Sequence, residues 1–539
     1  MAGFIKSVLN DLIEKQFNIA DLTFILPSKR AGIFLKKELA SLTKKTLLAP
    51  VILSIEEFVE ELSQVRKISN VELLFEFYSV YSSKIDAPKK ESFDAFSKWA
   101  QILLQDFNEI DRFLIPQEKF FNYLFATRKI ENWTLDGEET PLIKEYLLLW
   151  ENMPEYYKNL REVLLSKDVG YQGLIYREAV NNLENYIQSH LKIKHVFLGF
   201  NALNKAESTI IQELLHYNLA EIYWDIDAVF LNDPIHDAGI FIREHKSLWK
   251  HFTNNDFNWI DNSYSDSKKI VSVGAPKSVG QAKYVGELLS QMPSLDNTAV
   301  VLANENLLSP VLSSLPNNDE ALNITMGFPL RSIPLASLFE QLFLLHKNAQ
   351  TLFYYKDVIN FITQPLIKPL FNNNSQLIVE TIKANNYIYL TKEIINELSG
   401  ESKDIIELLF DSWDNDPEKT LTQCSTLIYR IKDHLIHQKK ETLLTLEYLY
   451  RFNELFNTLI RLNTEFKHLN SIKALYGLYK ELLKSETLDF KGEPLQGLQI
   501  MGVLESRVLD FETVIITSVN EGILTAGKSN NTFIQFDLK

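Results

Sequence analysis

The sequence predicts a multidomain protein of the mixed α/β class, in which long helical segments interrupt units of alternating strands and helices. A strand–helix–strand pattern opens the chain near residue 23 and recurs near residue 270. Each pattern leads into a long stretch of helical periodicity, residues 70–190 and 336–488, after which short apolar strands resume. A chain of 539 residues also exceeds what one hydrophobic core organises, so three or four domains are expected.

The first unit begins with a predicted strand at residues 23–26, which are apolar and partly β-branched. A helix is expected over 30–42 and a second strand over 51–53. Ser54 and Glu57 have the spacing of a capping box, which predicts another helix directly after that strand. Strand, helix and strand in this order indicate a right-handed parallel crossover.

The stretch from 70 to 190 is predicted to be helical, because one apolar face recurs at helical spacing. That face consists of Phe93, Phe96, Ala100, Leu103, Leu104 and Phe107. The many aromatic residues here are expected to pack in a core, and base stacking by exposed rings is the alternative. Strands are predicted again at 195–199 and 221–225, with Asn204 and Glu207 as a second capping pair between them.

A polar segment at 253–268 is the best candidate for a linker to the second unit. After it we expect a strand at 270–274, a helix at 279–289 and a strand at 298–303. The last strands are predicted at 498–501 and 513–518, joined by the polar elbow 505–507. Loops at the carboxyl ends of parallel strands are where α/β folds place their ligand contacts.

Charge and composition restrict the function. The net charge of −15 argues against a broad, charge-driven nucleic-acid coat. Residues 1–45 nevertheless carry eight Lys and Arg against four Asp and Glu, so a local basic groove and ordinary solvated helix faces both stay open. Cys424 is the only cysteine, which excludes a disulfide framework, a Cys-rich zinc site and a four-Cys cluster within this chain. A reducing cytoplasm is the expected location.

Membrane insertion and secretion are not expected. No stretch of about 18 uncharged apolar residues occurs. The first ten residues, MAGFIKSVLN, continue into an amphipathic pattern and do not form a secretory signal.

Five segments, in this order along the chain, carry a family resemblance. They are TFILPSKRAG (23–32), FSKWAQILLQDFNEID (96–111), VFLGFNALNKAE (196–207), NITMGFPL (323–330) and GLQIMGVLESRVLDFETVIITSVNEG (497–522). The set resembles UvrD-like, superfamily 1 DNA helicases, and more closely the AddB branch of AddAB/RecBCD-type helicase-nucleases.

The resemblance implies two RecA-like parallel-sheet motor domains, each with a mostly α-helical inserted domain. The first motor domain, which is degenerate and lacks a Walker A motif, would be 1–65 plus 190–255, with its insert at 66–189. The second would be 256–335 plus 490–539, with its insert at 336–489. No repeat is visible in the sequence itself.

An ATP site is not expected in the first motor domain. A P-loop needs Gly-rich backbone, a Lys and a Ser or Thr after the first strand. Here that position reads PSKRAG (27–32), with one Gly and a Pro that removes a backbone donor. A match to G-x-x-x-x-G-K-[ST] does occur near the end of the sequence, at Gly522, Gly527, Lys528 and Ser529. The residues after it are poor helix formers, so we interpret the match as coincidental; an ATPase that uses Lys528 is the alternative.

No catalytic or metal-binding residue is assigned. The family resemblance implies a PD-(D/E)XK nuclease domain after the second motor domain, but this sequence ends at Lys539, just past the motor motifs. No Gly-x-x-Asp…Asp-x-Lys pattern occurs within it, so no nuclease activity is expected and the nuclease domain is expected to be missing. Mg²⁺ and ATP are expected only in that domain or in a partner subunit. The pairs His434/His437 and His236/His245 are interpreted as structural.

The resemblance also supplies candidate DNA contacts, since strand-end loops of both motor domains face the bound strand in the family. By position these are Ser28, Lys29, Arg30, Ser506 and Arg507. The predicted function is a catalytically inactive DNA-binding scaffold of AddB type, acting in double-strand break processing and recombinational repair. It would hold single-stranded or end-opened DNA beside an AddA/RecB-like helicase-nuclease subunit. A pure protein-interaction scaffold without DNA contact is a further alternative.

Overall fold

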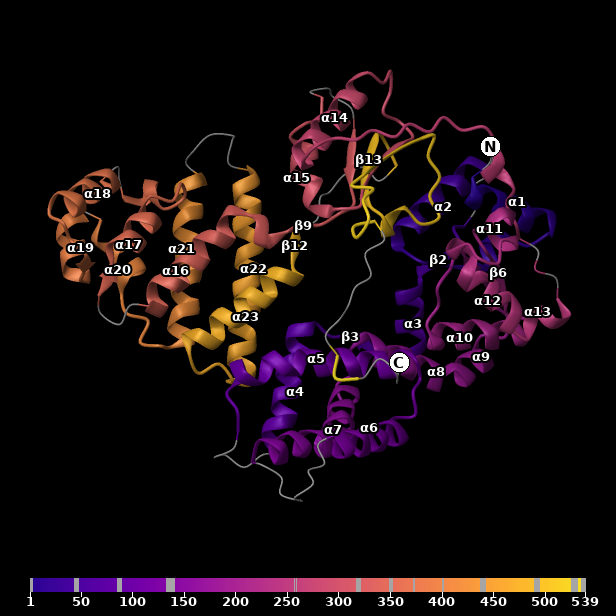
Figure 1. Cartoon of the computed structure of the whole chain (residues 1–539), viewed down its shortest axis with the longest axis horizontal. Helices are drawn as coiled ribbons and strands as arrows, with labels where there is room; N and C mark the ends of the chain where they lie inside the picture. Colours follow the sequence, from indigo (N-terminus) through magenta and orange to yellow (C-terminus); the bar gives the residue numbers. More distant parts are fainter. Residues whose placement is uncertain are drawn as a thin grey trace. The chain divides into compact units, whose positions relative to one another are not determined.

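The computed structural model of the chain describes most of its residues and has a mixed α/β architecture (Figure 1). The described residues are 3–42, 48–84, 90–131, 141–255, 257, 259–316, 321–348, 352–371, 374–399, 402–436, 443–488, 495–524 and 532–534. They group into two compact units. Unit 1 comprises Met1–Ile68, Ile102–Met326 and Asp489–Lys539, and unit 2 comprises Ser69–Gln101 and Gly327–Leu488.

This division differs from the inserts expected at 66–189 and 336–489. Residues 69–101 group with the second helical stretch, whereas residues 102–189 stay with the two sheets in unit 1. Helix α5 therefore contributes its first half to unit 2 and its second half to unit 1. The sequence gives no sign of this boundary, because it falls inside one continuous helix.

The first sheet of unit 1 is entirely parallel, with the strand order β2-β1-β5-β6. The strands are β1 (Leu22–Leu26), β2 (Val51–Ser54), β5 (Lys194–Leu198) and β6 (Ala220–Tyr223), close to the predicted ranges. Alternate residues face opposite sides, because side chains along a strand alternate. Phe24 and Leu26 pack in one core, and Ile25 packs in another. The sheet is therefore covered on both faces, which explains why β1 is buried throughout.

Helices on both faces cover this sheet (Figure 1). They are α1 (Phe4–Glu14), α2 (Lys29–Leu42), α3 (Ile55–Ser63), α8 (Gln172–Asn181), α9 (Leu183–Ser189) and α10 (Lys205–His216). Both predicted capping boxes are confirmed. Ser54 and Glu57 cap each other's backbone N–H at the start of α3, and Asn204 and Glu207 do so at α10. After β6 come α11 (Ala228–Asn232), α12 (Ile240–Leu248) and α13 (His251–Asn254).

The second sheet of unit 1 is also parallel, with the order β14-β7-β13-β8. Its strands are β7 (Thr298–Leu302), β8 (Leu322–Ile324), β13 (Leu498–Gly502) and β14 (Thr513–Thr517). Helices α14 (Ser278–Ser290) and α15 (Leu308–Leu312) belong to the same part of the chain.

The strand predicted at 270–274 is wrong. These residues join no strand, and Ile270, Val271 and Val273 are 85%, 68% and 51% exposed. The apolar residues do alternate, but a strand also needs a neighbouring strand that pairs with its backbone, and none of the described strands pairs with these residues.

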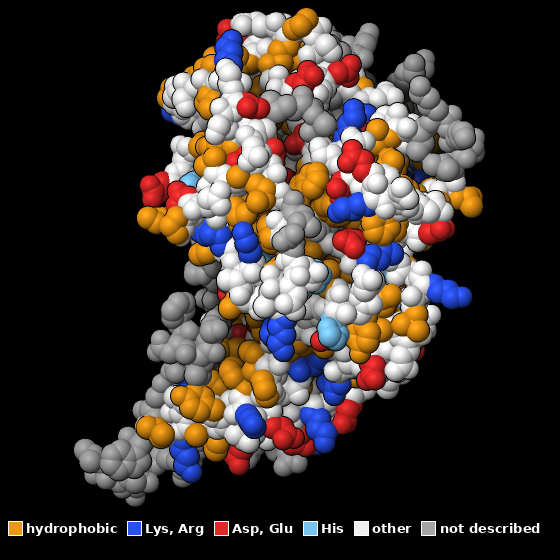
Figure 2. All heavy atoms as spheres, turned by 90° about the vertical axis from the view of Figure 1, so that its right-hand side faces the viewer, with side chains coloured by type: hydrophobic (Ala, Val, Ile, Leu, Met, Phe, Trp, Pro, Cys, Tyr) orange, Lys and Arg blue, Asp and Glu red, His pale blue; other side chains and the backbone are white. Residues whose placement is uncertain are grey.

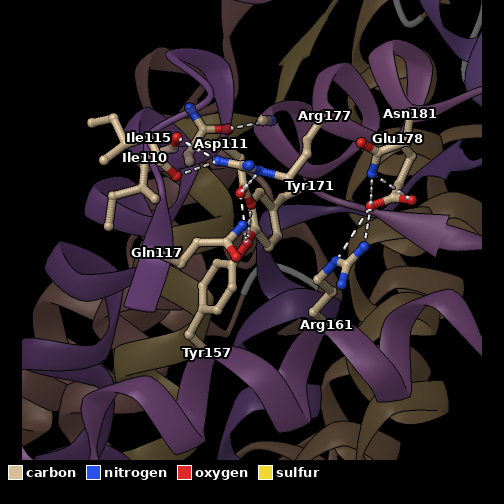
Figure 3. A network of polar contacts seen from close by, with 12 residues as sticks. Ile110, Asp111, Ile115, Gln117, Tyr157, Arg161, Tyr171, Arg177, Glu178 and Asn181 are labelled. Carbon is tan, nitrogen blue, oxygen red and sulfur yellow. Dashed lines mark hydrogen bonds and ion pairs between the residues drawn. The ribbon is translucent and has the colours of Figure 1, made fainter. Parts of the chain in front are cut away.

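The helices α5 (Phe93–Arg112), α6 (Gln117–Glu131) and α7 (Pro141–Leu165) lie between the sheet segments in sequence, and β3 (Arg66–Lys67) pairs with β4 (Val169–Gly170) beside them. At the end of α5, Asp111 is completely buried. It accepts hydrogen bonds from the hydroxyls of Tyr157 (2.6 Å) and Tyr171 (2.5 Å) and pairs with Arg177 (2.5 Å) (Figure 3). Arg177 also donates to the carbonyls of Ile110 and Ile115, which close the α5–α6 turn.

Unit 2 is almost entirely helical. Its helices are α4 (Asn70–Lys84), the first half of α5, α16 (Pro334–Asn348), α17 (Tyr355–Ile362), α18 (Ser375–Ala384), α19 (Lys392–Ser399), α20 (Lys403–Phe410), α21 (Pro417–Ile436), α22 (Leu443–Phe466) and α23 (Ile472–Ser485). Two short antiparallel pairs complete it, β9 (Phe328–Pro329) with β12 (Thr487–Leu488) and β10 (Phe353–Tyr354) with β11 (Tyr389–Leu390). Aromatic side chains such as Phe75, Phe77 and Phe96 are buried here, as core packing predicts. None of the described helices carries an apolar stretch long enough to span a bilayer.

Candidate functional site

The carboxyl edge of the first sheet is where an α/β fold of this kind would bind a ligand, and here a loop of the same chain lies over it. The loop, residues 503–511, connects β13 to β14 and is called the covering loop below. Val508 of this loop packs against Gly199, just after β5, and Asp510 binds the start of α1 near Asp225, just after β6. The strand before the loop, β13, contacts the chain just after β1. The two sheets of unit 1 are thereby joined at this edge.

The contact after β5 is the closest. Gly199 follows β5 with φ of +68°, and a Cβ atom placed there would lie 2.3 Å from Cγ2 of Val508. Val508 is only 6% exposed and belongs to the same core as Phe24 and Leu198. Its own φ is +66°, a conformation that a β-branched residue adopts only under strain. Such strain costs about 1–3 kcal/mol, and it persists only where surrounding contacts hold the residue.

The contact after β1 is polar and is made by β13, which leads into the covering loop. Arg30 lies in the first turn of α2 and donates from Nη2 to Oε1 of Gln499 in β13, at 2.7 Å. The same Gln499 oxygen accepts from the side chain of Asn323 at 2.8 Å, and Gln499 is 3% exposed. Burial lowers the pKa of Arg30 to about 10, which nearby Glu505 partly offsets. Among the described residues no partner satisfies the buried Nε and Nη1 atoms of Arg30.

Near the end of β6 the covering loop brings carboxylates close to one another. Asp510 accepts a hydrogen bond from the backbone N–H of Phe4, at 2.9 Å. The pKa of Asp225, two residues beyond β6, is raised to about 6 by the protein packed around its carboxyl and by repulsion from Asp510 and Asp261. Asp225 as a residue is exposed to solvent, which screens part of this repulsion. Burial also raises the pKa of Asp510.

This crowding predicts a pH-dependent stability. An acid whose pKa is raised by folding binds its proton more tightly in the folded state, so its ionisation opposes folding. The destabilisation is present above pH 6 and disappears as pH falls towards the unfolded pKa of about 4. We expect Asp225→Asn to raise the thermal unfolding midpoint at pH 7.5 and to have little effect at pH 4.5. Asp237→Asn, at an exposed carboxyl elsewhere in unit 1, is the control and should change neither value. An equal gain at both pH values would contradict the prediction.

The predicted DNA-contact residues that follow β1 differ in how far they are exposed to solvent. The Ser28 hydroxyl accepts from the N–H of Ala31 and so caps α2. Lys29 is 74% exposed and pairs with Glu57 at 2.7 Å, which raises the pKa of Lys29. The Arg30 guanidinium is instead engaged between the two sheets, where it does not present its charge to solvent.

The two candidates from the second sheet lie on the covering loop. Ser506 donates to the carbonyl of Val503 at 2.8 Å, within a short 3₁₀ turn. Arg507 is exposed, and within the described part of the chain it has no hydrogen-bond or ion-pair partner. Lys29 and Arg507 are therefore the two predicted cations that keep their charge at the surface.

Most residues of the alternative nucleotide motif lie outside the described part of the chain. Gly522 is exposed with φ of +77°, and a Cβ there would meet nothing within 4 Å. Gly527, Lys528 and Ser529 lie outside the described residues. Among the residues that the structure describes, no group of three or more His, Cys, Asp or Glu is arranged to hold a metal ion. Asp227, two residues after Asp225, caps α11 by accepting from the N–H of Val229.

Sequence reasoning missed Gly199, Val508 and Gln499, which make the closest contacts at this edge. Gly199 had a usable signal, because a glycine that follows a buried strand often marks a close approach. Val508 and Gln499 had none, since both look like ordinary strand or loop residues. No protein-family profile matches this sequence, and no curated protein sequence matches it.

Proposed function

We propose that this chain is a helicase-like scaffold of the AddB type, which binds single-stranded or end-opened DNA and does not itself hydrolyse ATP. It would act in the cytoplasm beside an active AddA/RecB-like helicase-nuclease subunit, during double-strand break processing. The RecA-like character of its two sheets is part of this proposal.

The covering loop is the observation that supports the proposal best. In an ATP-driven motor the carboxyl edge of the first sheet has to admit a nucleotide, and a Gly-rich loop has to surround its phosphates. Here Pro27 and Ser28 lead directly into α2, and Val508 packs against Gly199 at the same edge. The two sheets then form one continuous support rather than two lobes that close on a nucleotide.

The surface charge supports a small number of phosphate contacts rather than a broad basic groove. Figure 2 shows one face on which Lys and Arg are interspersed with Asp and Glu. The net charge of −15 agrees with this picture. Binding to a strand would therefore depend on single cations such as Lys29 and Arg507, each of which contributes a separate, salt-sensitive part of the affinity.

The test is the salt dependence of single-stranded DNA binding. For each phosphate that a cation neutralises, the affinity falls by about 0.7 log units per log unit of salt. We expect the double variant Lys29→Ala/Arg507→Ala to bind more weakly at low salt and to reduce that slope by about 1.4. Fluorescence anisotropy with a labelled oligonucleotide, titrated at several NaCl concentrations, measures both quantities.

Lys192→Ala is the matched control, because Lys192 is exposed just before β5, at the opposite edge of the same sheet. It should leave the slope unchanged. Equal slopes for the wild type and the double variant would overturn the assignment of Lys29 and Arg507. No DNA binding at any salt concentration would favour the pure protein-interaction scaffold.

The ATPase alternative needs its own measurement. Equilibrium binding of a fluorescent ATP analogue to the purified chain should show no saturable signal if the proposal is right. Saturable binding that is lost in Lys528→Ala would overturn it and assign the nucleotide to residues 522–529.

A further inference from the structure

A short segment near the end of the sequence lies against the helices α5, α6 and α7 of unit 1. It consists of Thr532, Phe533 and Ile534, and is called the docked segment below. It contacts α5 although about 426 residues separate the two in sequence. Ile534 is 5% exposed, so this part of the segment is buried rather than lying on the surface.

One buried carboxylate binds the backbone and a side chain of this segment. Asp106, in α5, is 3% exposed. Its Oδ1 accepts from the Thr532 hydroxyl at 2.5 Å, and its Oδ2 accepts from the N–H of Phe533 at 2.8 Å. The Thr532 hydroxyl oxygen accepts in turn from the N–H of Ile534 at 3.0 Å, which fixes the turn that presents both donors.

The other two helices bind the rest of the segment. Arg128, in α6, donates from Nη2 to the carbonyl of Phe533 at 2.9 Å. Its guanidinium lies 4.7 Å from the ring centre of Trp150, in α7, which is 1% exposed. The Phe533 ring meets the Trp150 ring edge-on, with 6.0 Å between centres.

These contacts resemble a peptide-recognition site more than incidental packing of a chain end. A charged carboxylate that is almost fully buried is costly unless both its oxygens are paired, and the segment pairs both. The three helices together recognise a hydroxyl, a backbone N–H, a backbone carbonyl and an aromatic ring. Apolar contact alone would require none of these directional groups.

We propose that α5, α6 and α7 form a receptor site for a short extended peptide, and that its ligand is the docked segment of the same chain. The ligand chemistry is a hydroxyl residue followed by an aromatic and then an aliphatic residue. The contact holds the chain beyond β14 against α5, α6 and α7, and is called the latch below. This inference does not depend on DNA binding.

The experiment is a competition in which a labelled synthetic peptide, NNTFIQF (residues 530–536), is added to the full chain. In the variant Thr532→Val/Phe533→Ala the latch is weakened from the ligand side, so the receptor site becomes available. We expect the peptide to bind this variant at least about tenfold more tightly than the wild type, because the wild-type segment competes at high effective concentration. Fluorescence anisotropy measures the two affinities.

Three comparisons make the result specific. A peptide with Val and Ala in place of Thr and Phe should not bind. Adding Asp106→Asn to the latch variant should weaken the peptide by at least about tenfold, since one of its two carboxylate contacts then faces an amide donor. Adding Arg128→Gln tests the same site without touching the buried carboxylate, and should also weaken binding.

Circular dichroism and thermal unfolding of each variant show whether the receptor variants stay folded. If Asp106→Asn unfolds, Arg128→Gln decides the matter. Absence of peptide binding to the folded latch variant, or binding that neither receptor variant weakens, would overturn the proposal. Tight binding to the wild type and the latch variant alike would also overturn it, because the docked segment would then not compete for the site.

Discussion

Replacing Asp111 by Asn is expected to lower the free energy of unfolding of unit 1 by about 3–5 kcal/mol. Asp111 is completely buried and receives two tyrosine hydroxyls and the Arg177 guanidinium (Figure 3). The substitution removes the negative charge and leaves the guanidinium, which is 13% exposed, without its counter-ion. Breaking a buried ion pair from one side is costly, because the remaining charge cannot return to water. Urea denaturation followed by circular dichroism measures the loss.

A nearby ion pair gives a matched control for Asp111. Arg161 and Glu178 are 2.7 Å apart in the same group of helices, but their side chains are 35% and 17% exposed. Glu178→Gln should therefore cost about 1 kcal/mol or less. Because a buried pair can be replaced by apolar groups without loss, Asp111→Leu/Arg177→Met should recover part of the stability. Similar losses for Asp111→Asn and Glu178→Gln would show that the network is not the structural centre of these helices.

Replacing Gly199 by Ala is expected to destabilise the contact between the two sheets by more than about 2 kcal/mol. Two effects add. An L-residue at φ of +68° costs about 1–2 kcal/mol, and the new Cβ would lie 2.3 Å from Cγ2 of Val508. The methyl group has little room to move, because Val508 is itself buried and held at a positive φ. Urea denaturation of unit 1 again gives the magnitude.

A double-mutant cycle with Val508→Gly separates these two effects. Glycine at 508 removes the methyl groups that clash and adopts φ of +66° without strain. In that background Gly199→Ala should cost only the backbone term, so the coupling between the sites should be about 1–3 kcal/mol. Strictly additive effects would mean that Val508 does not pack on Gly199 in solution, and the covering loop would then lose its role in the proposed function.

Several parts of the fold could be predicted from local sequence. Seven of the eight strands predicted as part of the two α/β units are present, and both capping boxes are formed. Such features depend on side chains within a few residues of each other, so periodicity and capping rules find them. The strand predicted at 270–274 is absent because a strand depends on pairing with a distant segment, which local alternation of apolar residues does not reveal. None of the described strands pairs with these residues.

The candidate site was predictable only in part. The sequence placed Arg30 and Arg507 at strand ends, and both do lie at the junction of the two sheets. It could not tell that Arg30 is buried against Gln499, whereas Arg507 stays exposed. The two arginines look alike in sequence, since the difference between them depends on which segment of the other sheet lies opposite each one.

Local sequence patterns predict most of the strands and helices along the chain, the two capping boxes and the alternation of α/β and helical segments. They do not predict that β13 and the covering loop meet the carboxyl edge of the first sheet, or that the docked segment binds α5. The pairs involved, Arg30 with Gln499 and Asp106 with Thr532, are 469 and 426 residues apart. Local propensity carries no information about such distant pairs, because they form only when burial and hydrogen bonding bring separate elements together.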